Sequence, residues 1–179
     1  MSLVIRPATH DDAAAVAAIY RPYVESTVIT FEVTPPSEAD MRTRMQTVLA
    51  RFPWLVAEEA GEVVGYAYAS SHRDRAAYQW SVDVAVYLRQ DMHRKGIGRR
   101  LYSTLFPMLV QQGLVNAYAG ITLPNDKSVG LHEALGFTPV GVYRHVGFKM
   151  GQWHDVGWWH LALQSLPAAP QPPIVWSTT

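Results

Sequence analysis

Hydrophobic and polar positions along the chain predict strands and helices in an irregular order. Runs rich in β-branched and aromatic residues, bounded by turn residues, predict strands, whereas apolar residues spaced three and four apart predict amphipathic helices. The predicted strands occupy residues 3–6, 53–57, 63–69, 78–88, 115–123, 137–148 and 156–163. The predicted helices begin near Thr9, Ser37, Gly96 and Asn125, and Gly136 follows the last of them as a C-terminal cap.

The connections between these segments predict a mixed sheet. A short polar turn joins 53–57 to 63–69, so these strands form an antiparallel hairpin. The strand at 78–88, the helix after it and the strand at 115–123 form one crossover, which we expect to be parallel and right-handed. The fold class is therefore α/β with a mixed (α+β) sheet of about seven strands flanked by helices.

Two segments are predicted to lie outside regular structure. Residues 26–31 are rich in β-branched residues, but Pro35 and Pro36 follow, so we expect a structured loop near a functional site. The chain after Leu166 is rich in proline and is predicted to be extended or disordered. The predicted organisation is one domain over 1–166 and a tail over 167–179.

Composition excludes several classes of function. A net charge of +0 gives no global attraction to nucleic acid or to an anionic membrane. The absence of cysteine excludes thiol catalysis, cysteine-ligated metals and disulfides. The first residues lack the pattern of a secretory signal, and no apolar run is long enough to span a membrane, so we expect a cytoplasmic protein.

The strongest chemical signal lies between residues 82 and 100. An apolar strand leads into a basic turn with Gly96 and Gly98, and an amphipathic helix follows. Backbone N–H groups at a helix N-terminus bind anions, and glycine lets a diphosphate approach them. The spacing matches neither the nucleotide P-loop nor the dinucleotide fingerprint, because Leu101 stands where the latter needs a third glycine. An ordinary strand–helix turn with solvated Lys and Arg side chains remains the alternative interpretation.

The sequence of this turn resembles the cofactor loop of the GNAT superfamily of acyl-CoA N-acyltransferases. That loop reads Gln/Arg-x-x-Gly-x-Gly/Ala, and here it reads His93-Arg-Lys-Gly96-Ile-Gly98, with His93 as the departure. Residues 125–137 match a second motif, Asn-x-x-Ala-x-x-Leu-Tyr-x-x-x-Gly-Phe, with His132 in the position of the Tyr. The stretches 66–69, 82–87, 123–126, 131–137 and 146–156 resemble the phosphinothricin and methionine sulfoximine acetyltransferases. The likeness covers about residues 3–165.

The resemblance implies a GNAT-like mixed sheet and acetyl-CoA as cosubstrate. It also implies that the strand before the glycine turn carries a bulge, which points backbone N–H groups at the thioester oxygen. The residues that the resemblance assigns to acetyl-CoA are Val86, Tyr87, Leu88, Arg94, Lys95, Gly96, Ile97, Gly98, Arg99, Asn125 and Ser128.

Two titratable residues are candidates for proton transfer. Asp83 lies in an apolar run, at the position where related enzymes place a Glu as general base. Because Asp is one methylene shorter, we expect a water between its carboxylate and the amine. His132 is suited to proton transfer at neutral pH, on the amine or on the departing thiolate. The alternatives are a solvent-facing Asp83 on an edge strand and a structural, partly buried His132.

The acceptor is expected to be a small molecule with a carboxylate. Arg73 and Arg75 precede the catalytic strand and are suited to bind that carboxylate in a bidentate manner. Phe31 and Glu32 from the 26–36 loop, together with Tyr78, are further candidates, although surface charge or core packing also explains each of them. The histidines lack metal-ligand spacing, so no metal is expected.

The predicted activity is acetyl-CoA-dependent N-acetylation of a small amino acid or analogue, of the phosphinothricin or methionine sulfoximine type. One alternative is acetylation of a protein N-terminus or of another small amine. A peptide acceptor would require an open groove, whereas a small acceptor predicts a pocket closed by the 26–36 loop. A non-catalytic acyl-CoA-binding module is the alternative from another class. The resemblance also implies a homodimer.

Overall fold

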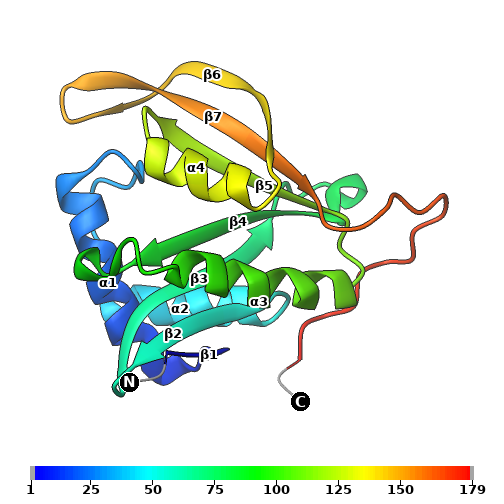
Figure 1. Ribbon diagram of the computed structural model, residues 1–179, viewed down its shortest axis with the longest axis horizontal. Helices are drawn as coiled ribbons and strands as arrows, with labels where there is room; N and C mark the ends of the chain where they lie inside the picture. Colours follow the sequence, from blue (N-terminus) through cyan, green and yellow to red (C-terminus); the bar gives the residue numbers. More distant parts are fainter. Residues whose placement is uncertain (1–2, 178–179) are drawn as a thin grey trace.

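A computed structural model, which describes residues 3–177, contains a seven-stranded mixed sheet with the strand order β1-β2-β3-β4-β5-β7-β6 (Figure 1). The strands are β1 (Val4–Pro7), β2 (Trp54–Glu59), β3 (Glu62–Ser71), β4 (Ser81–Leu88), β5 (Asn116–Leu123), β6 (Thr138–Lys149) and β7 (Gln152–Ala162). The helices are α1 (Ala13–Ser26), α2 (Glu38–Leu49), α3 (Ile97–Gln111) and α4 (Asp126–Ala134). The predicted order of elements and the mixed-sheet fold class are confirmed.

The strand pairing also follows the prediction. β4 and β5 are parallel, with α3 as the crossover between them, and the other neighbouring strands in the sheet are antiparallel. The α1–α2 connection over residues 27–37 contains neither helix nor strand, as expected for the loop. The helix start predicted near Ser37 is confirmed, and a capping box forms there, in which the Ser37 hydroxyl accepts the Asp40 N–H and the Asp40 carboxylate accepts the Ser37 N–H.

Two predicted strand boundaries are wrong. The strand predicted at 78–88 begins at Ser81, because residues Ala76–Tyr78 form a single turn of 3-10 helix. The last strand begins at Gln152 instead of 156, because β6 and β7 continue as a hairpin beyond the rest of the sheet. Met150 and Gly151 have φ values of 53° and 76°, the left-handed conformations that a two-residue hairpin turn requires.

The sheet separates two hydrophobic layers. Even-numbered β4 residues, such as Val82 and Val84, pack in the layer that contains Leu101 and Leu105 of α3. Tyr87, on the opposite face of β4, packs with Tyr20 and Tyr23 of α1. This alternation gives the faces of β4 different neighbours, namely α3 on one side and α1 with α2 on the other.

Two structural features bear on ligand classes. No helix among residues 3–177 combines the length and the apolar character needed to cross a membrane. Within those residues, His, Asp and Glu side chains do not gather in threes around a point that could hold a metal ion.

Residues 167–177 of the proline-rich tail contain neither helix nor strand, and they pack against the domain. The Ile174 N–H donates to the Gln112 carbonyl at 2.8 Å, and the Trp176 N–H donates to the Arg51 carbonyl at 3.1 Å. The buried Gln112 side chain bridges the two segments, since its Nε2 donates to the carbonyls of Arg51 and Ile174, each at 2.8 Å. Backbone bonds and one buried amide therefore hold the tail at the end of α3.

Replacing Gln112 with Ala is expected to lower the free energy of unfolding by about 1–3 kcal/mol, because the buried side chain and its two hydrogen bonds to the carbonyls of Arg51 and Ile174 are lost. Thermal unfolding should show this as a Tm lower by roughly 2–12 °C for a chain of this size. Gln111→Ala is the matched control, since Gln111 is the exposed last residue of α3 and Gln112 is the C-cap that follows it. Equal Tm values for the two variants would contradict a stabilising role for the tail bridge.

Candidate active site

The parallel strands β4 and β5 pair over three residues and then diverge. Their pairing ends at Asp83 and Tyr118, and in Figure 1 the two ribbons meet at one end and open toward the other. On the β3 side, the Ser81 carbonyl accepts the His72 N–H, and the Arg89 N–H donates to the Val64 carbonyl. Because an antiparallel ladder alternates, odd-numbered β4 residues bond to β3 and even-numbered ones face the opened side.

The backbone of Val84, Val86 and Leu88 therefore points into the space that β5 has left. The predicted bulge in this strand is wrong, because β3 and β4 pair in one uninterrupted register from Gly65 with Leu88 to Ser71 with Val82. The divergence of β5 frees these backbone groups instead. Among these backbone groups, the Leu88 carbonyl already has a hydrogen-bond partner, because it accepts the Tyr23 hydroxyl at 2.6 Å.

A cleft that is open to solvent occupies the space between the two strands. We call it the slit. Its walls come from β4, β5, α3, α4 and the α1–α2 loop. They include Ile29, Val84, Ala85, Val86, Tyr87, Tyr102, Gly120, Thr122, Asn125, Ser128 and His132. Tyr102 and His132 belong to the α3–α4 side of the sheet and Ile29 to the opposite side, so the slit passes between the strands from one face to the other.

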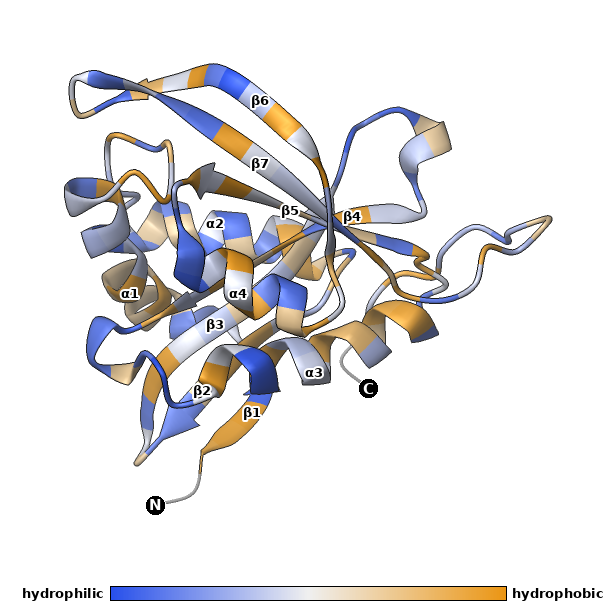
Figure 2. Cartoon of the chain, turned by 45° about the horizontal axis from the view of Figure 1, so that its top comes forward, coloured by the Kyte–Doolittle hydropathy of each residue, from blue (hydrophilic) through white to orange (hydrophobic). Residues whose placement is uncertain are grey.

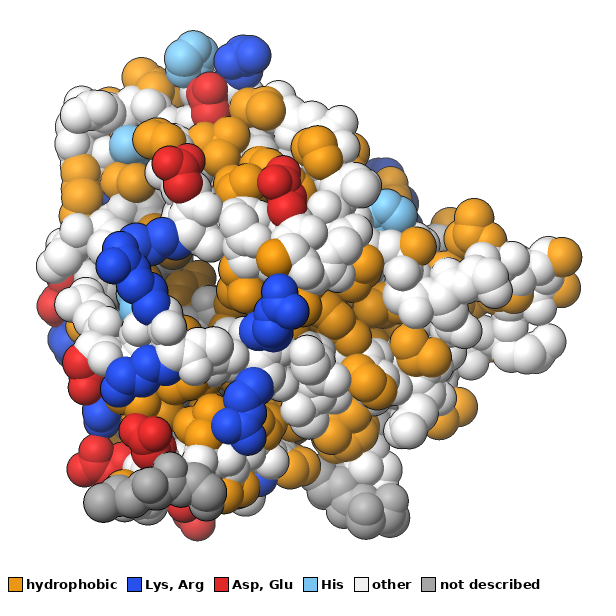
Figure 3. Space-filling model, viewed as in Figure 1, with side chains coloured by type: hydrophobic (Ala, Val, Ile, Leu, Met, Phe, Trp, Pro, Cys, Tyr) orange, Lys and Arg blue, Asp and Glu red, His pale blue; other side chains and the backbone are white. Residues whose placement is uncertain are grey.

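The N-terminus of α3 has the features of an anion site. Arg94 and Gly96 have φ values of 64° and 75°, and this left-handed backbone turns the chain into the helix. Arg94, Lys95, Gly96 and Arg99 are exposed. The first N–H groups of a helix have no intrahelical acceptor and attract negative charge. The space-filling view shows a hollow with apolar walls between α3 and α4, with Lys and Arg side chains beside it (Figure 3).

Ile97 and Gly98 are buried at the same turn, so only their backbone is available to a ligand. A Cβ on Gly98 would lie 3.2 Å from Leu131 Cδ2 and 3.7 Å from Val86 Cγ2. The glycine therefore allows α3 to approach both α4 and β4, which narrows the space between the two helices.

On the α3–α4 side, His132 is 4% exposed and both of its ring nitrogens have partners. Its Nδ1–H donates to the Ser128 carbonyl at 2.7 Å, so its Nε2 accepts the Tyr102 hydroxyl at 3.2 Å. Burial lowers the pKa of His132 and favours the neutral ring. Asn125 caps α4 by accepting the Ser128 N–H at 3.2 Å. The Tyr102 hydroxyl, which His132 orients, belongs to a residue that lines the slit on this side.

Asp83 lies on the opposite face of β4, in the middle of the sheet. The alternative of a solvent-facing Asp83 on an edge strand is therefore wrong. Its Oδ1 lies 2.6 Å from His72 Nδ1. Burial raises the pKa of the Asp83 carboxyl, and the hydrogen bond from His72 opposes this rise.

Arg73, Arg75 and Tyr78, which are predicted to bind the acceptor, follow β3 and lie at different distances from Asp83. Tyr78 stands edge-on to the His72 ring at 5.9 Å, and the Arg73 guanidinium lies 5.8 Å from the centre of a Trp158 ring. These two residues are therefore close to Asp83. Arg75 is exposed at the N-cap of the 3-10 turn.

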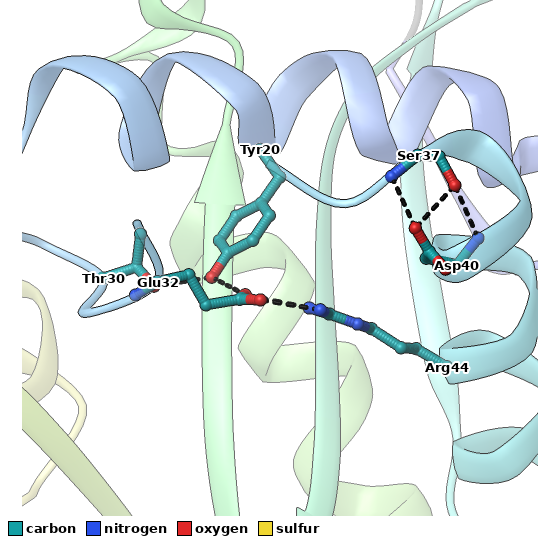
Figure 4. Close-up of polar contacts among 6 residues, drawn as sticks. All are labelled: Tyr20, Thr30, Glu32, Ser37, Asp40 and Arg44. Atoms are coloured by element: carbon teal, nitrogen blue, oxygen red, sulfur yellow. Dashed lines mark hydrogen bonds and ion pairs between the residues drawn. The ribbon is translucent and has the colours of Figure 1, made fainter. Parts of the chain in front are cut away.

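The loop that carries Phe31 and Glu32 is fixed by a polar network (Figure 4). The Glu32 carboxylate accepts both Nη groups of Arg44, at 2.8 and 2.6 Å, and also accepts the Tyr20 hydroxyl. Arg44 lowers the pKa of this carboxyl. Glu32, expected to contact the acceptor, thus has its carboxylate bound to α1 and α2, where it holds the loop in place.

The same loop contacts the β6–β7 hairpin. The Phe31 ring packs so closely on Gly147 that the backbone there has no room for a Cβ. The buried Lys149 ammonium donates to the Thr30 carbonyl at 2.9 Å. The loop and the hairpin therefore contact each other beside the slit, which Ile29 of the loop lines.

The Acetyltransferase (GNAT) domain family matches residues 5–158 of the chain, which include both sides of the slit. The chain is a GNAT acetyltransferase. It is 44% identical over 168 residues to a phosphinothricin N-acetyltransferase of Streptomyces viridochromogenes, covering 94% of this chain and 91% of that protein. It is 36% identical over 172 residues to the L-methionine sulfoximine/L-methionine sulfone acetyltransferase of Pseudomonas aeruginosa, covering 95% and 100%.

Solved structures agree with this assignment. The GNAT phosphinothricin acetyltransferase from Sinorhizobium meliloti, in complex with acetyl-CoA, superposes with a TM-score of 0.89. The two sequences are 35% identical, and the match covers 99% of this acetyltransferase and 100% of that chain.

Two residues of this GNAT acetyltransferase were missed by sequence reasoning. His72 stands in a polar loop after β3, and its contact with Asp83 depends on the register of two strands. Tyr102 lies in the apolar stripe of α3, which is typical of a core residue. Neither position carries a sequence signal that separates it from a structural residue.

Proposed function

We propose that this acetyltransferase transfers the acetyl group of acetyl-CoA to the α-amine of a small amino acid analogue of the phosphinothricin or methionine sulfoximine type. The observation that carries the proposal is the slit between β4 and β5. The basic N-terminus of α3 lies on one side of the sheet, and the partly buried Asp83 carboxylate lies on the opposite face of β4. Both named relatives act, by their names, on compounds of this type.

In this proposal acetyl-CoA enters from the α3–α4 side. Its diphosphate binds the backbone of Gly96, Ile97 and Gly98, with Arg94, Lys95 and Arg99 supplying positive charge. The pantetheine arm follows the opened edge of β4 beside Val86, Tyr87 and Leu88, and Asn125 and Ser128 face it from α4. This places the thioester in the slit, where the outward-pointing N–H groups of β4 stabilise the oxyanion that develops in the transition state.

The acceptor binds on the Asp83 side. The acceptor ammonium first gives one proton to a general base that is hydrogen-bonded to Asp83. The neutral amine then attacks the thioester carbonyl. As the C–N bond forms and the C–S bond breaks, the departing thiolate takes the hydroxyl proton of Tyr102, which turns from His132 Nε2 to the sulfur. The nitrogen loses its second proton and restores Tyr102, so the products are the amide, CoA–SH and one proton.

A small acceptor is favoured over a peptide by the contacts of the α1–α2 loop. Phe31 and Thr30 reach the β6–β7 hairpin, so loop and hairpin close one side of the acceptor space. A peptide would need that side open in order to continue past the reacting amine. Arg73 and Tyr78 stand at the remaining approach to Asp83, in positions suited to a small acid.

Arg73→Ala or Arg75→Ala is expected to raise the KM of the acceptor by about 10–100-fold, which is the cost of one charged hydrogen bond to its carboxylate. The KM of acetyl-CoA should change little, and the variant with the larger effect identifies the binding residue. Steady-state kinetics on the acid and on its carboxamide provide the test. If wild type uses both with the same KM, no arginine binds the carboxylate.

We also propose a homodimer that covers β6. Hydrophobic positions recur along this edge strand (Figure 2), where Val140 is 62% exposed and Phe148 is 58% exposed, and Trp153 of β7 is 63% exposed. Exposed apolar groups that gather at one edge of a sheet are typical of an interaction surface. Light scattering should give twice the mass of the chain, and the mass of one chain would contradict the dimer.

The proposed function is tested by thiol release from acetyl-CoA with a panel of acceptors. Phosphinothricin, methionine sulfoximine and methionine sulfone form one arm, proteinogenic amino acids a second, and short peptides a third. We expect the highest kcat/KM in the first arm. Highest turnover with peptides would replace the proposed acceptor class, and no thiol release with any amine would favour an acyl-CoA-binding module.

A further inference from the structure

The contact between His72 and Asp83 leaves one imidazole nitrogen available for chemistry. Asp83 Oδ1 lies 2.6 Å from His72 Nδ1, and the side chains are 30% and 16% exposed, respectively. A carboxylate only accepts hydrogen bonds, so Nδ1 carries the proton and the neutral ring has its lone pair on Nε2. Among residues 3–177, no hydrogen-bond partner occupies that Nε2.

The imidazole ring is held from three directions. It stacks on Tyr118 of β5 with ring centres 4.7 Å apart and an interplanar angle of 26°. Tyr78 and Trp158 meet it edge-on, at 5.9 and 6.0 Å. A catalytic side chain needs this kind of support, because its orientation is then fixed before the substrate arrives.

We propose that His72 is the catalytic base that takes the proton from the acceptor amine, and that Asp83 is the positioning residue behind it. This inference rests on the proposed function. It replaces the expected water between the short Asp83 side chain and the amine with an imidazole. The acceptor ammonium gives one N–H proton to His72 Nε2, the amine lone pair then forms the bond to the thioester carbon, and the imidazolium later returns its proton to solvent.

The charged and titratable groups around the ring suit this role. Asp83 from β4 is the carboxylate among them, and it stabilises the imidazolium that forms. Tyr118 from β5 and Tyr78 from the 3-10 turn face the ring with their aromatic side chains. Arg73 is adjacent in sequence, and its charge opposes in small part the rise in the pKa of Asp83 that burial causes. Imidazole as a chemical group takes up and releases protons in the neutral pH range, which suits it to accept a proton from an ammonium.

His72→Asn separates the two roles of the ring. The Asn amide can still donate to Asp83 but cannot accept a proton. We expect kcat/KM for the acceptor to fall by about 10²–10⁴-fold at neutral pH, the usual effect of a lost general base. The Kd of acetyl-CoA should be unchanged, and the deficit should shrink as the pH rises and more acceptor is present as free amine.

Chemical rescue gives a second and independent readout. Added imidazole should restore part of the activity of His72→Ala, whereas pyrazole, which has nearly the same shape but is far less basic, should not. His160→Asn is the matched control. His160 contacts the same Tyr118 ring at 5.0 Å, but its Nε2 pairs with the Asn116 amide oxygen instead of a carboxylate. This variant is expected to keep the wild-type pH profile.

Three outcomes would overturn the proposal. An active wild type with a similarly active His72→Asn would mean that Asp83 reaches the amine without the imidazole. Equal rescue by imidazole and pyrazole would mean that the ring acts through packing alone. A wild type without thiol release on the whole acceptor panel would overturn the proposed function itself, and the role of His72 with it.

Discussion

Asp83→Asn is expected to lower kcat by about 10²–10⁴-fold, or roughly 3–5 kcal/mol in the activation barrier, because the acceptor amine loses the carboxylate that drives its deprotonation. The Kd of acetyl-CoA should stay within a few-fold of wild type, because Asp83 faces away from α3 and α4. Steady-state kinetics and calorimetric titration with acetyl-CoA measure these two quantities separately.

The same variant should not be less stable than wild type at neutral pH. Burial raises the pKa of Asp83 in the folded state, so the ionised carboxylate disfavours folding. The stability that this group contributes is fully present below its unfolded-state pKa and is lost as the pH rises through the folded-state pKa. Asn removes that dependence, so the Tm of Asp83→Asn should equal or exceed that of wild type at neutral pH.

The combination of lost turnover and retained stability distinguishes a catalytic carboxylate from a structural one. The kinetic deficit should also diminish at high pH, where the acceptor amine is already neutral. A variant that unfolds at lower temperature and binds acetyl-CoA weakly would indicate that Asp83 supports the sheet. Unchanged kcat in a folded protein would remove Asp83 from the mechanism.

Gly96→Asp is expected to raise the Kd of acetyl-CoA by about 10–100-fold, or roughly 1.4–2.7 kcal/mol, because it places an anion where the diphosphate meets the N-terminus of α3. A Cβ at Gly96 meets no atom within 4 Å, so the new side chain has room. The backbone there has φ of 75°, which Asp and Asn tolerate better than most residues.

Gly96→Asn is the matched control for this prediction. It has nearly the same size and the same backbone cost but no charge, so its Kd should remain within a few-fold of wild type. A short acetyl thioester that lacks the diphosphate should react equally with both variants. If Asp and Asn weaken acetyl-CoA binding to the same extent, the diphosphate does not lie at this turn.

Local patterns account for most of the fold. The capping box at Ser37 and the amphipathic stripe of α3 depend on neighbours within one or two helical turns, so the sequence contains the complete signal. The start of β4 was harder to predict, because residues 76–78 and the strand after them share a similar composition. The long β6–β7 hairpin depends on two left-handed residues, Met150 and Gly151, and methionine gives no sign of that conformation.

The parts of the site that were predictable from the sequence are motifs contained in one contiguous segment of the chain. The glycine turn and the Asn125 cap lie within contiguous segments, and their positions match the expectation. Contacts between distant segments were not predictable. Asp83 meets His72 because β3 and β4 pair in a particular register, and Glu32 is bound by Arg44 because α2 packs beside the loop. The bulge expected in β4 was wrong for the same reason. The unpaired backbone groups of β4 depend on the residue at which β5 diverges from it, which is a contact between distant segments.

The most direct test of this account is a crystal structure of the protein with acetyl-CoA and an N-acetylated or desamino analogue of the acceptor. The diphosphate should lie at the N-terminus of α3, and the thioester oxygen should accept a hydrogen bond from an even-numbered residue of β4, Val84 or Val86. The acceptor analogue should lie on the opposite face of the sheet, within reach of His72 Nε2. A thioester outside the slit, or an acceptor bound on the α3–α4 side, would contradict transfer through the divergence of β4 and β5.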